Sequence, residues 1–332
     1  MKRREFITLL GGAAAASAWP LRARSQQPNR MRRIGVLLNS VEADPLFRSY
    51  MAAFVEALGK LGWVEGRSLH IDHRWVGGDV ERARVYAAEL VGLSPDAILA
   101  SSTTNLKAVQ KETQSIPIVF VQVSDPVAQG FVPSLTHPGG NITGFAAFEF
   151  SMGGKWLELL KEIASGIARI AIIFNPDTSP QSQFFVRSIA AAAPSFGVEA
   201  MASPVHEEDE IEPAINRFSR QPGGGLIFPT DSWTELRGAL FVGLAARYQL
   251  PALYTRSQIV KAGGLMSYIF DGQEQFRQAA TYLDRILKGA NPGDLPIQLP
   301  TRFELTINLK TAKGLGLTAP PSLLATAEDV IE

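Results

Sequence analysis

The sequence predicts an α/β protein made of two similar lobes, each an open, doubly wound parallel sheet. Short apolar runs with little internal alternation recur along the chain, and segments with helical periodicity lie between them. Such runs are typical of strands buried on both faces of a parallel sheet, and regular alternation with helices is typical of the α/β class. Apolar runs of the first half reappear in the second at offsets of 136, 128 and 134 positions, which indicates two lobes of one design.

The first element along the chain is an export signal at residues 1–25. The basic start Lys2-Arg3-Arg4 precedes a weakly apolar run, Thr8–Ala18, which is the layout of a secretory signal. Adjacent arginines fit the twin-arginine variety, and the run is too short to span ~30 Å of hydrocarbon, which takes ~20 residues. We expect cleavage near Ser25 and Gln26 and a mature protein in the periplasm. A cytosolic amphipathic helix is the alternative.

Composition agrees with an exported protein that diffuses freely. Removing the signal takes 32 basic and 32 acidic residues to 27 and 31, a net charge of −4. This balance argues against a nucleic-acid or anionic-membrane partner, because both ask for a basic face. The sequence has no cysteine, so it offers no disulfide, thiolate nucleophile or acceptor for an N-terminal lipid anchor, and we expect a monomer without stable membrane insertion.

The strands and helices of the two lobes follow in order after the signal. The paired strand-like runs are 33–39 with 169–175, 97–102 with 225–230, and 116–120 with 250–254. The helix-period segments are 46–61, 80–93, 105–113, 181–193, 207–218 and 233–248. The last part does not fit simple duplication: a helix at 273–288, a Pro-rich turn at 291–296 and a strand at 303–309. These leftover elements predict a chain that crosses between the lobes more than once, which makes a hinge suited to closure.

Polar residues gather where the predicted strands end, and ligands of open α/β sheets bind at those carboxyl ends. Ser102, Thr103 and Thr178 lie at helix starts, where hydroxyl and backbone N–H groups favour a carboxylate. Asp125 and Asp231 could face each other across a cleft and pair with a ligand's ammonium group. The alternative is that each of these residues only caps its helix.

Aromatic residues near the ends of second-lobe strands complete the expected site. Tyr254, Tyr268 and Trp233 lie at or near those ends, where a ring could stack on a ligand. We therefore expect a small carboxylate with an aromatic or bulky apolar group, and first of all an aromatic amino acid. Ordinary packing within the lobe is the alternative for each ring, and sugars could use similar aromatics.

Signatures of catalysis and of cofactor binding are missing from the sequence. There is no G-x-S-x-G elbow, no G-x-x-x-x-G-K-[ST] loop and no G-x-G-x-x-G after a strand. His70 and His73 lie on a probable strand, where a spacing of three puts the rings on opposite faces. We expect no metal, no cofactor and no enzymatic activity, although Asp125 and Asp231 leave a periplasmic acid/base enzyme as an alternative.

Five segments of the sequence match a known family: 116–127 (IPIVFVQVSDPV), 137–144 (HPGGNITG), 168–176 (ARIAIIFNP), 262–268 (AGGLMSY) and 300–317 (PTRFELTINLKTAKGLGL). Through these segments the chain resembles the substrate-binding proteins of ABC transporters, in the family that includes tryptophan/tyrosine-type binding proteins. The resemblance implies a type I periplasmic-binding-protein fold, two lobes joined by three crossings, and a small-molecule ligand closed between them. It also implies delivery to a membrane permease that an ATPase drives.

The resemblance carries the family's binding positions onto particular residues of this chain. They are Ser102, Thr103, Asp125, Asn175, Thr178 and Asp231. We expect lobe 1 at 32–146 plus about 272–300, lobe 2 at 147–271 plus about 301–332, and hinge points near 145–150, 270–272 and 299–302. A sensor module that reports to a membrane receptor remains an alternative to transport.

Overall fold

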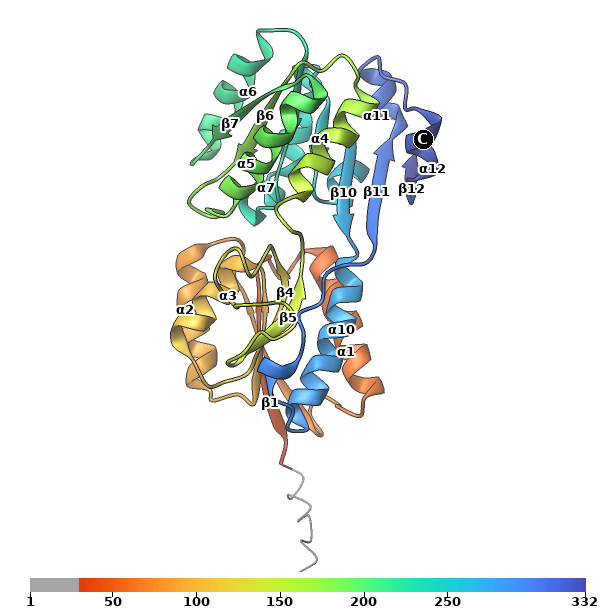
Figure 1. The fold of residues 1–332 in the computed structure, drawn as a ribbon. Coiled ribbons are helices and arrows are strands. Elements are labelled where there is room, and N and C mark those ends of the chain that lie inside the picture. The colour runs from red at the N-terminus through yellow and green to blue at the C-terminus, as the bar shows by residue number, and fades with distance from the viewer. Residues whose placement is uncertain (1–29) are drawn as a thin grey trace, which may run out of the picture. The chain divides into compact units, whose positions relative to one another are not determined.

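The computed structural model describes residues 30–332 (Figure 1), so the predicted export signal lies outside the described residues. Between residues 30 and 332, no helix combines the length and the apolar character that crossing a membrane requires. The described chain forms two sheets, each covered by helices on both faces.

The first sheet has 5 parallel strands in the order β2-β1-β3-β4-β5. Its strands are β1 (Arg32–Leu38), β2 (Leu69–Trp75), β3 (Ala97–Ser101), β4 (Ile118–Val123) and β5 (Ile142–Ala146). Helices α1 (Pro45–Lys60) and α10 (Gly272–Leu287) cover one face, and α2 (Val80–Gly92) and α3 (Thr103–Glu112) cover the other. We call this sheet with its helices the first lobe.

Alternation along the strands explains how both faces become buried. Ile34, Val36 and Leu38 pack under α1 and α10, whereas Leu37 packs under α2. Successive strand side chains point to opposite faces, and all four are fully buried. A strand that meets helices on both sides therefore needs a continuous apolar run, as the sequence has here.

The second sheet has 7 strands in the order β12-β11-β10-β9-β8-β6-β7. Its strands are β6 (Arg169–Phe174), β7 (Glu199–Pro204), β8 (Gly224–Ile227), β9 (Ala252–Tyr254), β10 (Met266–Phe270), β11 (Phe303–Asn308) and β12 (Asp329–Ile331). All neighbours are parallel except β10 and β11, which run antiparallel.

Helices cover both faces of this second lobe as well. The core on one face includes residues of α4 (Met152–Ile163), α5 (Ser182–Ala192), α11 (Leu309–Gly314) and α12 (Pro321–Ala325). The core on the other face includes residues of α6 (Ile211–Ser219), α8 (Gly238–Arg247) and α9 (Ser257–Lys261). The short helix α7 (Ser232–Leu236) follows β8.

The two sheets repeat one strand order, which confirms the predicted internal duplication. The order β2-β1-β3-β4-β5 of the first sheet recurs as β7-β6-β8-β9-β10 in the second, and β11 and β12 extend the second sheet beyond it. This is the doubly wound order in which ligands bind at the carboxyl ends of the strands. The predicted α/β class with two doubly wound lobes is correct.

The chain passes between the two lobes three times, as Figure 1 shows. It leaves the first sheet after β5 for α4, returns after β10 to α10, and leaves again after residue 298 for β11. Helix α10 follows a second-lobe strand but packs on α1 and on β3, β4 and β5 of the first lobe. The additional C-terminal helix and strand expected from the sequence are therefore α10, reached by the second crossing, and β11, reached by the third.

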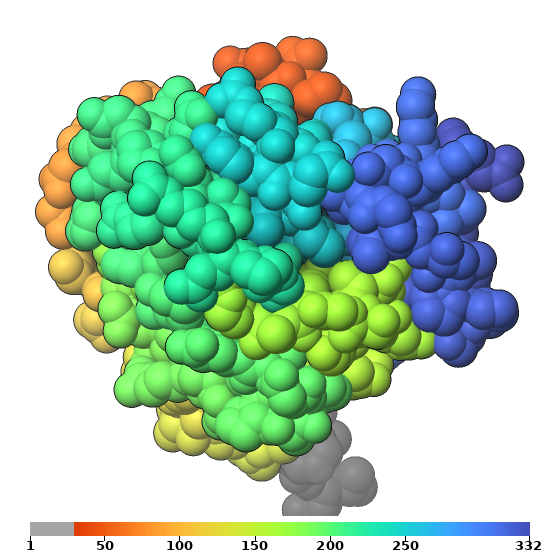
Figure 2. All heavy atoms as spheres, turned by 90° about the horizontal axis from the view of Figure 1, so that it is seen from above, coloured from red at the N-terminus to blue at the C-terminus, as the bar shows by residue number. Residues whose placement is uncertain are grey.

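The C-terminal segment closes the outer side of the second lobe. Seen from above in Figure 2, its dark blue residues form one block beside the yellow-green residues of α4. Helices α12 and α4 are in contact, and the Ser322 hydroxyl donates to Glu162 Oε1 at 2.8 Å. This docking completes the apolar cover on one face of the larger sheet.

Candidate ligand-binding site between the lobes

A cavity of about 250 Å³ lies where the carboxyl ends of the strands of both lobes meet. First-lobe residues in its wall include Asn39, Phe47, Tyr50, Ser102 and Gln122. The rest of the wall includes Thr230, Ser232, Glu235, Arg256, Phe270, Asp271, Gly272 and Glu304. The wall is thus shared between both lobes and the crossings, the arrangement expected of a ligand site that closes by lobe movement.

Direct contacts hold the two lobes together around this cavity. Asn39 Nδ2 donates to Ser232 Oγ at 2.7 Å, and the Thr104 hydroxyl donates to the Thr178 carbonyl at 3.2 Å. Arg256 of the second lobe adds an ion pair to Asp44 of the first, with 3.2 Å between Nη2 and Oδ2. The structure is therefore a closed arrangement of the lobes.

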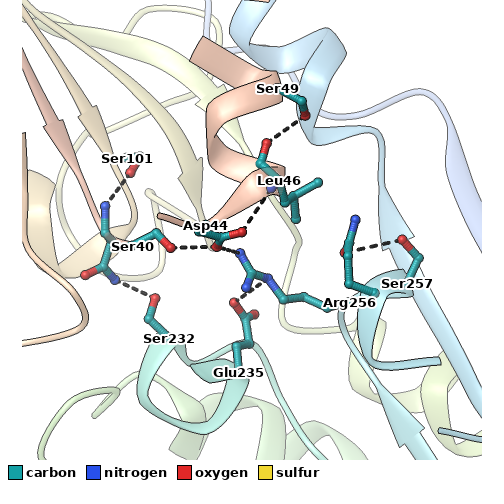
Figure 3. Close-up of polar contacts among 11 residues, drawn as sticks. Ser40, Asp44, Leu46, Ser49, Ser101, Ser232, Glu235, Arg256 and Ser257 are labelled. Atoms are coloured by element: carbon teal, nitrogen blue, oxygen red, sulfur yellow. Dashed lines mark hydrogen bonds and ion pairs between the residues drawn. The ribbon is translucent and has the colours of Figure 1, made fainter. Parts of the chain in front are cut away.

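Arg256 is the electrostatic centre of this interface, as Figure 3 shows. Its Nε lies 3.1 Å from Glu235 Oε2, and its guanidinium carbon lies 5.4 Å from the centre of the Phe47 ring. The side chains of Arg256, Asp44 and Glu235 are each 12% exposed. The two carboxylates thus pair with one guanidinium. Burying a charged side chain is costly unless it is paired with an opposite charge in this way.

The two carboxylates around Arg256 differ in their tendency to ionise. Burial raises the pKa of Glu235 to about 7, although the Arg256 charge acts in the opposite direction. Burial also opposes ionisation of Asp44, but the hydrogen bond from Ser40 and the Arg256 charge outweigh it and lower the pKa of Asp44. Asp44 additionally caps α1 by accepting from the Leu46 N–H at 3.0 Å.

Aromatic rings form the apolar part of the cavity wall. Phe47 and Tyr50 belong to α1, their ring centres are 5.5 Å apart, and Phe270 lies at the end of β10. Gly272 admits the Tyr50 ring, because a Cβ there would lie 2.6 Å from the Tyr50 hydroxyl. Offset and edge contacts between such rings and a ligand ring contribute ~0.5–1.5 kcal/mol each.

Strained backbone lies at the carboxyl ends of first-lobe strands. Ser102 has a φ of 82°, and Gln122, at the bulge between Val121 and Val123, has a φ of 60°. Both residues line the cavity. Positive φ at residues other than glycine costs ~1–3 kcal/mol and gathers at functional sites. The Gln122 N–H is held by Gln275 Oε1 at 3.2 Å, so α10 fixes this unusual turn.

Of the predicted site residues, only Ser102 lies in the cavity wall. Thr103 and Thr178 instead line a separate hollow of about 190 Å³ at the margin between the lobes. Asn175 stabilises the loop that follows it: its Oδ1 accepts hydrogen bonds from the N–H groups of Asp177 and Thr178 at 2.9 and 3.2 Å.

Asp231 and Asp125, which were expected to face each other and hold an ammonium group, both lie outside the cavity wall. Asp231 is 4% exposed and accepts hydrogen bonds from Thr178, Thr234 and the Trp233 N–H. Burial raises its pKa, and these hydrogen bonds act against that shift. Asp125 accepts from the Ala128 N–H at 3.0 Å and is not part of the wall. For both, helix or turn capping is the observed role.

The tyrosines predicted to stack on a ligand also lie elsewhere. Tyr254 is 1% exposed, and its ring stacks on Phe228 within the core under α8, with centres 5.0 Å apart. Tyr268 stacks on Phe303 at 5.4 Å and packs toward the α4 side of the sheet. Tyr254 ends β9 and Tyr268 lies in the middle of β10, and in both strands the alternation of side chains turns the ring into a helix-covered face.

The sequence prediction missed the charged and aromatic residues that do line the cavity. One pattern could have found Arg256: the offset of 134 positions that relates Ile116 to Leu250 also relates Gln122 to Arg256. Both residues line the cavity: Gln122 lies at the bulge near the end of β4, and Arg256 lies two residues after β9. No such pattern marks Phe47 and Tyr50, because in the sequence they look like ordinary apolar residues of an amphipathic helix.

A family model described as "ABC transporter substrate binding protein" matches residues 33–331. The chain belongs to this family. As a substrate-binding protein of the ABC type, it is the solute-binding component of a transport system, and the sequence-based resemblance is confirmed. In the described part, residues 30–332, no group of three or more metal-ligating side chains could hold a metal ion.

Similar proteins extend over nearly the whole chain. A tyrosine-binding protein of Clostridioides difficile is 24% identical over 311 residues, covering 94% of this chain and 89% of the relative. A conserved domain protein of Vibrio cholerae has a TM-score of 0.83 at 25% identity, covering 91% of this chain and 100% of the other. A Streptococcus pneumoniae ABC domain in complex with L-Trp has a TM-score of 0.82 at 23% identity, covering 90% and 99%.

The ligand-free, open structure of a substrate-binding protein from Clostridium difficile gives a lower TM-score of 0.68, at 25% identity over 90% of this chain and 99% of the other. The substrate-binding protein described here therefore superposes better on the L-Trp complex than on this open form, in line with the contacts that join its lobes.

Proposed function

We propose that this substrate-binding protein captures an aromatic amino acid, or a closely related small carboxylate, in the cavity between its lobes. It then delivers this solute to the permease and ATPase of an ABC import system. The protein works in the periplasm as a freely diffusing binder, without enzymatic activity. The observation that carries the proposal is the cavity itself, with the paired rings of Phe47 and Tyr50 on one side and polar groups of both lobes on the other.

The size and lining of the cavity support a single small solute. Its volume of about 250 Å³ is near the lower end of the ~300–1,000 Å³ typical of ligand pockets. Aromatic side chains from α1 and β10 suit an aromatic group, while Asn39, Gln122 and Ser232 offer hydrogen bonds. Relatives that bind tyrosine or are solved with L-Trp agree with this ligand class.

Closure of the lobes supports capture followed by delivery. We propose that lobe 1 (32–146 and about 272–300) and lobe 2 (147–271 and about 301–332) close around the ligand by bending at the three crossings. The ion pair and hydrogen bonds between the lobes belong to the closed form. A ligand that touches both lobes favours this form, because it binds one state better than the other.

A binding screen with a matched pair of variants tests the ligand class. We expect tryptophan or tyrosine to bind the wild-type protein at micromolar concentration, about −8 kcal/mol, and to raise its thermal midpoint. Gln122→Ala should weaken this binding about threefold to tenfold, the effect of one lost hydrogen bond. Gln249→Ala is the control, because Gln249 also has a positive φ, 52°, but lies outside the cavity wall.

The screen covers amino acids, aromatic acids and sugars, by thermal shift and then calorimetry. Stabilisation by sugars alone would overturn the proposed ligand class. Equal weakening by the Gln122 and Gln249 substitutions would show that the cavity is not the binding site.

The proposed location makes a prediction about the mature N-terminus. We expect the protein from its native host to begin near Gln26, because Arg3 and Arg4 precede a short apolar run. Mass spectrometry of the purified protein measures this directly. Substituting Lys for both arginines should retain precursor inside the cell if the route is twin-arginine. An intact Met1 on a cytoplasmic protein would contradict the location.

A further inference from the structure

We propose that Asp271 and Glu304, where two of the crossings meet the second lobe, receive a cationic group of the ligand. The ligand then carries an ammonium group, and these two carboxylates select for it. This inference rests on the proposed function, because it names the chemistry that the same cavity requires of its solute.

The two carboxylates lie beside neighbouring crossings and line the same cavity. Asp271 follows β10 directly, and Glu304 lies in β11 opposite Ile269 of β10, in the antiparallel pair. Asp271 accepts one hydrogen bond, from the Glu274 N–H at 2.9 Å to Oδ1, which caps α10. Within residues 30–332, neither Asp271 nor Glu304 forms an ion pair. Both are partly exposed, so a ligand can reach them.

The charge of the cavity wall is unbalanced in favour of a cation. Its charged side chains are the carboxylates of Glu235, Asp271 and Glu304 and the guanidinium of Arg256. Arg256 is already engaged, by Glu235 at 3.1 Å and by Asp44 at 3.2 Å. Burial raises the pKa of Glu304 and repulsion from Asp271 adds to that shift, while the charges of Arg302 and Lys261 act against it. A ligand cation would relieve this repulsion.

Asn39 gives a second, independent sign that the cavity takes a polar ligand. Its side chain lines the same cavity and is 8% exposed, and its Oδ1 has no hydrogen-bond partner among the described residues. A buried acceptor without a partner costs ~1–3 kcal/mol unless a ligand or water supplies one. The cavity therefore has several acceptors that await donors, and an ammonium group brings up to three.

Conservative variants allow the carboxylates to be tested without disturbing the fold. Asp271→Asn keeps the helix cap, since asparagine caps helices as well as aspartate does, and Glu304→Gln keeps the shape of the side chain. The matched control is Asp79→Asn, because Asp79 caps α2 by accepting from the Arg82 N–H at 2.9 Å but lies outside the cavity wall.

The probes are L-tryptophan, tryptamine and indole-3-propionate, which share the indole ring but differ in ammonium and carboxylate. We expect Asp271→Asn and Glu304→Gln each to weaken the binding of L-tryptophan and tryptamine about tenfold to hundredfold, the effect of losing a charge-assisted hydrogen bond. Indole-3-propionate should bind wild-type protein more weakly than L-tryptophan and should bind the variants no less tightly than wild type. Calorimetry at constant ionic strength measures the affinity of each of the three probes for wild-type and variant proteins.

The outcomes separate this inference from the proposed function. Wild-type binding of indole-3-propionate as tight as that of L-tryptophan would overturn the inference alone, as would equal weakening of all three probes in the variants. If no aromatic amino acid binds, the proposed ligand class fails, and the inference is then judged on the solute that the wider screen returns. A solute without a cationic group would overturn it, and a cationic solute that loses affinity in both variants would support it.

Discussion

Gly144→Ala is expected to unfold the first lobe. Gly144 lies in β5, paired with Phe120 of β4, and a Cβ there would overlap the Phe120 carbonyl oxygen and lie 2.6 Å from its backbone nitrogen. No rotamer change relieves an overlap with backbone, so β4 and β5 would have to separate. Gly144 also has a φ of 155°, which side chains rarely adopt. We expect a loss of more than ~4 kcal/mol, beyond the range of most point mutations.

Circular dichroism during thermal unfolding, together with the soluble yield, measures this effect. Gly166→Ala is the matched control, since a Cβ at Gly166 has no neighbour within 4 Å and no positive φ is involved. Gly139→Ala isolates the cost of positive φ alone, with φ of 68° and open space around the position. A thermal midpoint for Gly144→Ala equal to that of Gly139→Ala would contradict the predicted clash.

The fold could be predicted because it depends on patterns that a single sequence carries. Strands buried on both faces need continuous apolar runs, and the duplicated strand order left matched runs such as 33–39 and 169–175. Boundaries were less predictable: the segment 233–248 forms two helices, α7 and α8, that meet at Arg237. Its helical periodicity continues across the break, so the pattern alone does not show it.

The site was less predictable, because apolar patterning does not tell which face a strand-end residue turns to. Tyr254 is the last residue of β9 and Arg256 lies two positions further on, yet Tyr254 packs in the core and Arg256 lines the cavity. Asp231 and Asp125 are carboxylates near strand ends, as a ligand site would need, but nearby N–H and hydroxyl groups already donate hydrogen bonds to them. Asp271 and Glu304 become neighbours only through the antiparallel pairing of β10 and β11.

Arg256→Met is expected both to open the lobes and to lower stability. It leaves the carboxylates of Asp44 and Glu235, with side chains 12% exposed, without the guanidinium that pairs with them. Removing one partner of a buried ion pair costs ~3–5 kcal/mol, a fall of the thermal midpoint on the order of 10 °C for a chain of this size. Asp44 can return to water if the lobes separate, whereas Glu235 belongs to the same lobe as Arg256. We therefore expect a larger radius of gyration from small-angle scattering, together with a lower midpoint.

Two further variants separate the effect on closure from the effect on the second lobe. Asp44→Asn removes only the charge pair between the lobes, while asparagine still caps α1, so it should increase the radius of gyration with a smaller loss of stability. Arg237→Met is the matched control, because Arg237 lies outside the cavity wall. Its guanidinium carbon lies 4.0 Å from the centre of the Trp233 ring, and it pairs with Glu208, whose side chain is 63% exposed. Exposed pairs contribute little, so both measurements should stay close to wild type. If Arg256→Met leaves the radius and the midpoint unchanged, Arg256 does not hold the lobes closed.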